Sequence, residues 1–568
     1  MFWKKYIKPY QWPAIIGFFF KMCEALLELC VPLVVASIID KGVSKGNNHY
    51  ITQMAFVLFG LAVCGYLCAL VCQYFASLTS QGCGTLMRKD MFRAINAYDY
   101  ENLDEIGTPS LITRLTNDVN QLQVSIAMTI RLASRSPFLI IGSLVMSFMI
   151  NAKIAMIFLI ISPLIALSIY IVMSLSEPIY VRVQKLLDQV SLITRENLSG
   201  VRVIRAFNKQ PIEKKRFHKA TKRQKEQQIT AGNISILMNP ATTVIVNTGI
   251  ILILYQGSFK INMGTLTQGE IIALINYMNQ ILLSMYAFAN VIIGYVKSAA
   301  CAKRIKQVLS IEPAIQEGKK AAPLQYDSMI TFDDVSFTYK EGHALAHLSF
   351  DIKPHTTIGI IGGTGAGKST LVHLIPRFYD ATSGRITIKG QSIKDYTFSS
   401  LREMIGFVPQ SATLFSGTIR DNLLWGNAQA TNQELEEALA LSQGAEFVHK
   451  CEKGLETRIE QSGKNVSGGQ RQRLTIARAL VKKPEILILD DSASALDFAT
   501  DAALRKAIAT LPCTTLIVSQ RVSALMHADQ IIVLTHGEMA GMGTHQELMK
   551  TCALYQEIVH SQLEGDEA

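Results

Sequence analysis

Long apolar segments dominate the first 300 residues of this chain, and they restrict its fold more than any other feature. We predict six membrane-spanning helices, because each segment is long enough to cross a hydrocarbon layer about 30 Å thick. The segments lie near 14–39, 52–78, 128–150, 153–175, 237–259 and 268–296. The mean hydropathy of +0.24 is high for a soluble protein and agrees with this prediction.

The connections between these segments differ in length and charge. Residues 40–51 and 260–267 are short, whereas 79–127 and 176–236 are long, polar and rich in Lys and Arg. Basic residues accumulate on the cytoplasmic side of a membrane. We therefore predict a multi-pass protein of a bacterial plasma membrane, with the long connections and both termini in the cytoplasm. Residues 1–12, which are basic and aromatic, should lie at the membrane interface.

The net charge of +10 and the ten cysteines bear on partners and redox state. A basic chain can indicate nucleic-acid binding, but cations that flank membrane spans explain this charge better. We expect a lipid bilayer as partner and no nucleic acid. The cysteines form no C-x-x-C pair, so a reduced state is the default interpretation.

Several charged residues fall inside the predicted spans, where charge is costly. Lys21, Glu24 and Glu28 share one face of the first span. They form either an acidic patch that faces a cationic substrate or, as we favour, an ion pair that holds helices together. Arg131 and Arg135, at the start of the third span, are expected to snorkel to the interface. Four amides in the last two spans either line a path or bond neighbouring helices, namely Asn247, Asn276, Asn279 and Asn290.

The character of the sequence changes after residue 310. We predict a transmembrane domain over 1–310, a polar linker over 311–328 and a second domain over 329–568. In the second domain short β-rich runs alternate with helical segments, which is typical of an α/β fold.

A glycine-rich segment, Gly359–Thr370, follows an apolar strand in this second domain and precedes a helix. It matches the pattern G-x-x-x-x-G-K-[ST]. Glycines let backbone N–H groups turn toward phosphate oxygens, Lys368 can reach the β- and γ-phosphates, and the Ser369 hydroxyl can ligate Mg²⁺. We therefore predict binding of ATP and Mg²⁺. The expected binding residues are Gly362, Gly363, Thr364, Gly365, Ala366, Gly367, Lys368, Ser369 and Thr370.

Two segments of the long cytoplasmic connections, 98–123 and 196–217, each interrupt a helical pattern with a glycine, Gly107 or Gly200. Here the chain resembles the membrane half of ABC exporters of the six-helix, domain-swapped type. The resemblance implies that short helices in these segments couple the membrane domain to an α/β P-loop ATPase domain. The alternative is a solvated helical hairpin without a coupling role.

The later motifs of the second domain follow the order found in ABC ATPases. FVPQSATLF resembles the Q-loop, which implies that Gln410 reaches Mg²⁺ and the attacking water. ILILDD ends in Asp490, which the resemblance places in the Mg²⁺ shell. Tyr339 lies where the family has an aromatic residue that stacks on adenine. SALD resembles the D-loop, which runs from Ser494 to Asp497 and crosses the dimer interface.

VSGGQRQR resembles the ABC signature, which discriminates this family most strongly among ATPases with a phosphate-binding loop. The resemblance implies that the signature opens a helix whose N-terminus faces the γ-phosphate held by another subunit. Its residues are Ser467, Gly468, Gly469 and Gln470.

Two positions depart from the family pattern. Asp491 follows Asp490 where a hydrolytically competent member has Glu, and Gln520 occupies the position of the switch His. The shorter side chain retracts a carboxylate by about 1.5 Å, and misplacements near 1 Å can cost on the order of 10²-fold in rate. Glutamine cannot become cationic or shuttle a proton. Together the two changes indicate a site that binds ATP and hydrolyses it poorly.

The signature is intact although the catalytic positions are altered. The chain therefore resembles the degenerate-site subunit of bacterial heterodimeric multidrug-type exporters. This implies a second half-transporter with intact Glu and His, and export of a drug, lipid or peptide. Alternatives are a homodimer with two slow sites, an ATP-gated channel or sensor, and a soluble ATPase that acts on nucleic acid. The apolar segments argue against the last alternative.

Overall fold

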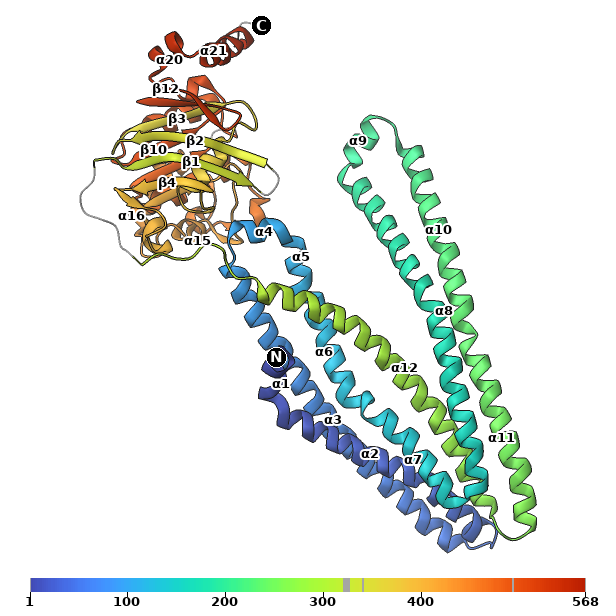
Figure 1. Ribbon diagram of the computed structural model, residues 1–568. Coiled ribbons are helices and arrows are strands. Elements are labelled where there is room, and N and C mark those ends of the chain that lie inside the picture. Colours follow the sequence, from blue (N-terminus) through green and yellow to red (C-terminus); the bar gives the residue numbers. More distant parts are fainter. Residues whose placement is uncertain (1, 320–326, 340–341, 493–494, 567–568) are drawn as a thin grey trace. The chain divides into compact units, whose positions relative to one another are not determined.

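The computed structural model describes residues 2–319, 327–339, 342–492 and 495–566 and separates into two compact units (Figure 1). The first unit consists of Met1–Ala97 and Ile106–Ile311, and the second of Tyr98–Glu105 and Glu312–Ala568. Part of the predicted linker, 320–326, and Ser494 of the predicted D-loop lie outside the described residues.

Among its described residues, the first unit contains helices joined by turns and no strand. Its elements are α1 (Phe2–Ile7), η1 (Lys8–Tyr10), α2 (Gln11–Ser37), η2 (Ile38–Val43), α3 (Asn48–Ala97), α5 (Thr108–Thr113), η3 (Arg114–Asp118), α6 (Val119–Met128), η4 (Thr129–Ala133), α7 (Arg135–Ile150), α8 (Ala152–Ser199), α9 (Val201–Ala206), α10 (Gln210–Ile236), α11 (Met238–Asn262) and α12 (Gln268–Ser310). Within the described residues, six continuous helical stretches are long and apolar enough to cross a membrane. The predicted six-span architecture is confirmed.

Two glycines separate helices where the sequence pattern breaks. Gly107 has φ +77°, a left-handed conformation that glycine adopts without strain, and it directly precedes α5. Gly200 ends α8 and directly precedes the short helix α9. The chain can therefore reverse between α8 and α10, which pack side by side (Figure 1).

Polar contacts within the first unit tie α2 to its neighbours. The Asp40 carboxylate accepts from the Thr267 hydroxyl at 2.6 Å and from the Gly269 N–H at 2.8 Å, which satisfies donors at the start of α12. The hydroxyl of Tyr277 donates to the backbone oxygen of Leu29 at 2.6 Å. These bonds join α2 and η2 to α12.

The charged residues of the spans form ion pairs. Lys21 pairs with Glu24 on the same helix at 2.7 Å, and Glu28 pairs with Arg135 of α7 at 2.5 Å. We favoured a Lys–Glu pair that joins helices, but Lys21 and Glu24 pair within α2, and it is the Glu28–Arg135 pair that joins two helices. Arg131, expected only to snorkel, donates to the Ser77 hydroxyl on α3 at 2.9 Å.

The second unit has a mixed central sheet. Among its described residues, six strands run in the order β12-β11-β3-β10-β9-β6. All neighbours are parallel except β11 and β12. Their bounds are β3 (Thr357–Gly362), β6 (Ile405–Val408), β9 (Ile486–Asp490), β10 (Thr514–Val518), β11 (Gln530–Thr535) and β12 (Glu538–Gly543). β9 is buried along its whole length, as expected for a parallel strand covered on both faces.

Smaller sheets and helices complete the second unit. In the part that the structure describes, a four-stranded antiparallel sheet has the order β2-β1-β4-β5, and β7 pairs with β8. The remaining strands are β1 (Ile330–Tyr339), β2 (Gly342–Ile352), β4 (Ser383–Ile388), β5 (Gln391–Ser392), β7 (Gly417–Thr418) and β8 (Arg458–Ile459). The helices are α4 (Tyr100–Ile106), α13 (Lys368–Leu374), α14 (Phe398–Glu403), α15 (Ile419–Leu424), α16 (Asn432–Leu441), α17 (Ala445–Lys450), α18 (Gly468–Val481), α19 (Phe498–Ile508), α20 (His545–Thr551) and α21 (Ala553–Asp566). The predicted α/β P-loop fold is confirmed.

The close approach of α2 and α12 can be tested with two glycines of the same helix. A Cβ at Gly269 would lie 2.3 Å from the backbone oxygen of Ala36, whereas a Cβ at Gly294 would meet no atom within 4 Å. We expect Gly269→Ala to destabilise the protein by about 1–3 kcal/mol through overpacking. Gly294→Ala should be neutral or stabilise it by up to about 1 kcal/mol. Thermal unfolding in detergent measures both, and equal unfolding temperatures would contradict the packing.

Candidate functional site

The loop between β3 and α13 leaves room for phosphate groups. A Cβ at Gly363 or Gly365 would meet no atom within 4 Å. Gly365 and Gly367 have φ values of +80° and +97°, which turn the backbone in a way that other residues resist. At Gly367 a Cβ would also approach the backbone oxygen of Ala344 to 2.7 Å. Glycine is therefore required in this loop for both conformation and space.

The ammonium of Lys368 lies inside this loop. Its Nζ donates to the backbone oxygens of Gly362 and Gly363, both at 2.8 Å. Burial lowers the pKa of Lys368, while the nearby Asp491 and Asp490 carboxylates act in the opposite direction. A cation in this place can exchange two carbonyl partners for phosphate oxygens.

Two oxygen ligands suited to Mg²⁺ meet beside the loop. The Ser369 hydroxyl, in the first turn of α13, donates to Oδ1 of Asp490 at 2.9 Å. Asp490 ends β9 and is buried, and this burial raises the pKa of its carboxyl. Mg²⁺ prefers a few carboxylate and hydroxyl oxygens together with substrate phosphates. The donor set therefore fits the predicted metal.

Gln410 and Asp491 lie next to this pair. The Gln410 amide donates to Oδ2 of Asp491 at 3.3 Å. The backbone N–H of Asp491 donates to the oxygen of Val518, so the ends of β9 and β10 stay together. Gln520 follows β10 by two residues and is exposed. Asp490, Asp491 and Gln520 therefore lie at the carboxyl ends of parallel strands. The glycine loop begins at the same edge of the sheet.

The remaining residues of the loop and its neighbourhood are placed as follows. Thr364 and Ala366 lie within the loop, and the Ala366 N–H donates to the oxygen of Gly363 at 3.2 Å. The hydroxyls of Thr370 and Tyr339 are 3.4 Å apart. The Tyr339 ring meets the ring of Tyr379 edge to face at 5.5 Å. Tyr339 therefore stands at the same end of α13 as the predicted phosphate site.

The signature residues begin α18. The Ser467 side chain accepts from the Gln470 N–H at 3.3 Å, and the Gln470 side chain accepts from the Ser467 N–H at 2.9 Å. This capping box leaves Gly468 and Gly469 in the first turn. Between the described residues, no hydrogen bond or ion pair joins this turn to the glycine loop of the same chain. Asp497 caps α19 by accepting from the Thr500 N–H at 2.9 Å.

A histidine that we did not predict lies beside the Ser369–Asp490 pair. His373 Nε2 of α13 is 3.6 Å from Oδ2 of Asp490, and burial lowers its pKa. Its ring also packs against Phe378 and Phe407. The position of His373 four residues after Ser369 on a helix is the sequence signal that could have identified it.

An aromatic contact that we did not predict includes part of the first coupling segment. The Tyr100 ring of α4 lies 4.6 Å from the Phe378 ring, and the Tyr379 hydroxyl donates to Asp104 at 2.7 Å. The guanidinium of Arg402 lies 5.8 Å from the Phe378 ring centre. Only Tyr98–Glu105 of the predicted segment 98–123 belongs to the compact unit of the ATPase fold. Long-range contacts of this kind leave no periodic signal in the sequence.

Gln562 of α21 contacts the backbone of Gln520, the predicted switch position, and of Val522. Its amide donates to the oxygen of Gln520 at 2.7 Å and accepts from the Val522 N–H at 2.8 Å. The side chain thus binds this segment as a neighbouring strand would. The C-terminal helix was not among the predicted site elements.

Both halves of the chain match families of known proteins. Residues 14–285 match the ABC transporter transmembrane region family, and residues 345–494 match the ABC transporter family. The uncharacterized ABC transporter ATP-binding protein YfiB of Bacillus subtilis (strain 168) is 39% identical over 99% of both chains. An ATP-dependent lipid A-core flippase of Vibrio parahaemolyticus is 28% identical over 98% of this chain and 96% of the flippase.

The fold is also similar to a solved structure, that of a bacterial Atm1-family ABC exporter with ATP bound. The TM-score is 0.81 and the sequence identity 21%, over 97% of this chain and 99% of the other. At this level of identity the similarity concerns the fold.

The Ser369–Asp490 pair predicts how nucleotide binding depends on metal and pH. We expect Mg²⁺ to strengthen ATP binding to the protein and to Ser369→Thr, which keeps the hydroxyl. In Ser369→Ala, the gain in ATP affinity caused by Mg²⁺ should be smaller by about tenfold or more. The ATP affinity of this variant should then resemble that of the unaltered protein in EDTA. The effect should also weaken as pH falls, because burial raises the pKa of Asp490 and only its carboxylate form binds metal. Titration with a fluorescent ATP analogue measures each affinity, and equal Mg²⁺ dependence of the Ala and Thr variants would contradict the assignment.

Proposed function

This chain belongs to the ABC transporter family, with a six-helix membrane domain and one ATPase domain in a single polypeptide, and from that premise we propose that it is one half of a heterodimeric exporter. Its own nucleotide site would bind ATP and hydrolyse it poorly. The observation that carries the proposal is the combination of an intact signature, Ser467–Gln470, with altered residues at 491 and 520.

The geometry of the glycine loop supports the binding half of this proposal. Lys368 would exchange the carbonyls of the loop for the β- and γ-phosphates, and the N–H groups of the loop would donate to the same oxygens. Ser369, Asp490 and Gln410 would hold Mg²⁺, which neutralises charge on the transferring phosphoryl group when it is bound. Tyr339 would stack on adenine. None of these roles requires Glu at 491 or His at 520.

The same geometry supports slow hydrolysis. Asp491 engages the Gln410 amide, and its carboxylate reaches less far than that of a glutamate by about 1.5 Å, a misplacement that can cost on the order of 10²-fold. The amide of Gln520 can donate a hydrogen bond to a γ-phosphate, but it cannot exchange a proton near neutral pH. The site would therefore retain ATP for longer than a site with Glu and His.

The separation of the signature from the loop supports a second subunit. In the proposed assembly the first turn of α18 faces the γ-phosphate bound by the partner, because N–H groups at a helix start favour anions. This turn would complete a competent site on a partner that carries Glu and His. The partner's signature would in turn close the site of this chain.

The contact between α4 and the ATPase fold supports coupling to the membrane helices. Tyr100 and Asp104 engage Phe378 and Tyr379, and Tyr379 also touches Tyr339 at the predicted adenine position. Closure of the two ATPase domains of the dimer around ATP would move α4. This movement would shift the bundle of membrane helices from an inward-open to an outward-open state. ATP can drive this change only by binding the closed state better than the open state.

The substrate would be hydrophobic or amphipathic, that is a drug, lipid or peptide. The relative described as a lipid A-core flippase supports an amphipathic class without naming the molecule. The long basic connections support a topology with both termini in the cytoplasm, so that transport would run outward.

Restoring the family residues should raise ATP turnover at this site. We expect the chain purified without a partner to hydrolyse ATP slowly, and the double variant Asp491→Glu with Gln520→His to be at least tenfold faster. Gln520→His alone is the control for the switch position. Steady-state phosphate release measures turnover, and brisk hydrolysis by the unaltered chain would contradict the degenerate-site proposal.

Weakening the aromatic contact should separate hydrolysis from transport. Tyr100→Ala removes the ring that packs on Phe378, so we expect several-fold less ATP-driven flux per ATP hydrolysed in proteoliposomes with the partner subunit. Tyr100→Phe keeps the ring and should behave as the unaltered protein. If Tyr100→Ala transports with unchanged stoichiometry, α4 does not transmit closure.

A further inference from the structure

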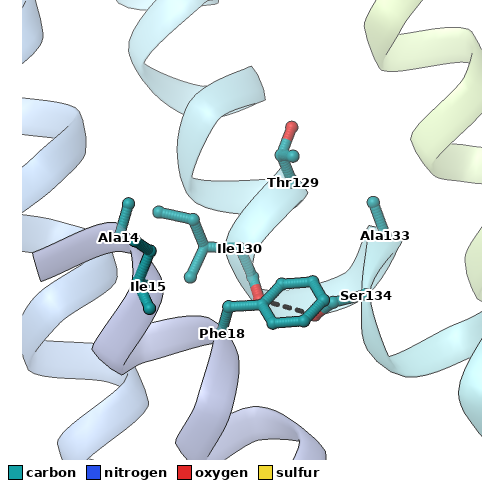
Figure 2. Close-up of a pocket in the computed structure, with 7 residues that line it drawn as sticks. All are labelled: Ala14, Ile15, Phe18, Thr129, Ile130, Ala133 and Ser134. Carbon is teal, nitrogen blue, oxygen red and sulfur yellow. Dashed lines mark hydrogen bonds between the residues drawn. The ribbon is translucent and has the colours of Figure 1, made fainter. Parts of the chain in front are cut away.

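A hollow of about 400 Å³ lies between α2 and η4 in the membrane domain (Figure 2). Ala14, Ile15 and Phe18 of α2 line one side. The other side is lined from η4 and the residue after it, by Thr129, Ile130, Ala133 and Ser134. Several of these side chains are small, and η4 is a π-helix, which has a wider turn than an α-helix.

The hollow is lined by hydrocarbon groups, and the two hydroxyl groups in its walls are already hydrogen-bonded. The Ser134 hydroxyl donates to the oxygen of Ile130 at 2.8 Å, which is the dashed line in Figure 2. The Thr129 hydroxyl donates to the oxygen of Ser125 and bonds the Tyr295 hydroxyl, both at 2.7 Å. Because both polar groups are already satisfied within the protein, the hollow fits an acyl chain better than a polar molecule.

The hollow opens on the apolar side of α2. Ile15 and Phe18 are 54% and 46% exposed. The charged side chains of Lys21 and Glu24, further along the same helix, are only 13% and 17% exposed. At the depth of a membrane span, an apolar opening of this kind suits hydrocarbon better than a charged group.

Cations lie just before the hollow in the chain. Tyr6 is buried and donates to Asp90 of α3 at 3.1 Å, and Lys5 pairs with the same carboxylate at 2.5 Å. These bonds fix α1 on α3. Lys4 and Lys8 are exposed, and no hydrogen bond or ion pair engages either of them within the described part of the chain.

The spacing of these groups matches the layers of a bilayer. Ala14 follows Lys8 by six residues, which correspond to about 9–11 Å along the 3-10 helix η1 and the start of α2. Trp12, which is 68% exposed, lies between them, and tryptophan is enriched at the membrane–water interface. Cations, an interfacial aromatic ring and an apolar hollow thus follow one another along α1 and α2.

We propose that the hollow binds one acyl chain of an anionic phospholipid from the adjacent leaflet, and that Lys4 and Lys8 hold its head group. The site is a lipid-binding site of the membrane domain. It does not depend on the heterodimer or on the state of the nucleotide site. Each lysine near a membrane surface contributes an attraction that corresponds to about fivefold in affinity for an anionic over a neutral lipid.

Native mass spectrometry of the full-length assembled transporter tests this site. The detergent-purified protein is incubated with equal amounts of phosphatidylglycerol and phosphatidylcholine that carry the same acyl chains. We expect retention of one phosphatidylglycerol per copy of this chain, with at least a tenfold preference over phosphatidylcholine. Equal retention of the two lipids by the unaltered protein would overturn the proposal.

Two sets of variants separate the head group from the acyl chain. Lys4→Gln with Lys8→Gln should abolish the preference but keep the bound lipid, whereas Lys41→Gln with Lys45→Gln, at the other end of the first span, should change nothing. Ala133→Leu, or Ile15→Trp if the first variant does not fold, should fill the hollow and lose both lipids. Leu67→Trp, at an exposed apolar position of α3, is the matched control for added bulk.

Three outcomes would contradict the site. Unchanged lipid retention in the filled variants would show that the hollow holds no acyl chain. An unchanged preference in the double lysine variant would show that the head group lies elsewhere. Lipid retained by the isolated chain but excluded from the assembled transporter would assign the hollow to a subunit contact. None of these measurements involves ATP, so their outcome does not test the proposed roles of the nucleotide site.

Discussion

The hydrogen bond between the Ser369 hydroxyl and the Asp490 carboxylate is the contact on which the nucleotide site depends. The two residues are far apart in the sequence and meet because β3 and β9 flank β10 in a parallel arrangement, so that α13 begins where β9 ends. Burial of Asp490 raises the free energy of its charged form. A divalent cation can offset this cost, and the fold therefore favours metal together with nucleotide.

From this pair a chain of contacts leads to α4. His373 is near Asp490 on one side and packs against Phe378 on the other, and Phe378 meets Tyr100. All of these residues belong to one compact unit, so their arrangement is internal to it. Well-packed interiors respond to a displaced neighbour by shifting as units. A change at the metal-binding residues can therefore reach α4 through direct contact between side chains.

The fold class and the phosphate-binding loop were predictable because their signals are local. Apolar length identifies a span, and the spacing of Gly362, Gly367 and Lys368 identifies the loop. The ring contact of Tyr100, the position of His373 beside Asp490 and the amide contact of Gln562 were missed, because they join residues that only the folded chain brings together. The hollow was missed for a related reason. The π-helical turn η4 forms one of its walls, and the apolar sequence there does not distinguish π from α geometry.

In the proposed site, the groups that would bind the nucleotide differ from those that would cleave it. The groups proposed to hold phosphate and metal, such as Lys368 and Asp490, are buried at strand and helix ends. Asp491 has φ +46°, a left-handed conformation that Asp tolerates better than most residues, and the backbone oxygen of Gln520 is held by Gln562. The N–H of Asp491 and the oxygen of Gln520 belong to the backbone, so neither contact is made by the side chain at that position. Because closure requires only that ATP bind the closed state more tightly, such a site can still drive closure while cleavage occurs elsewhere.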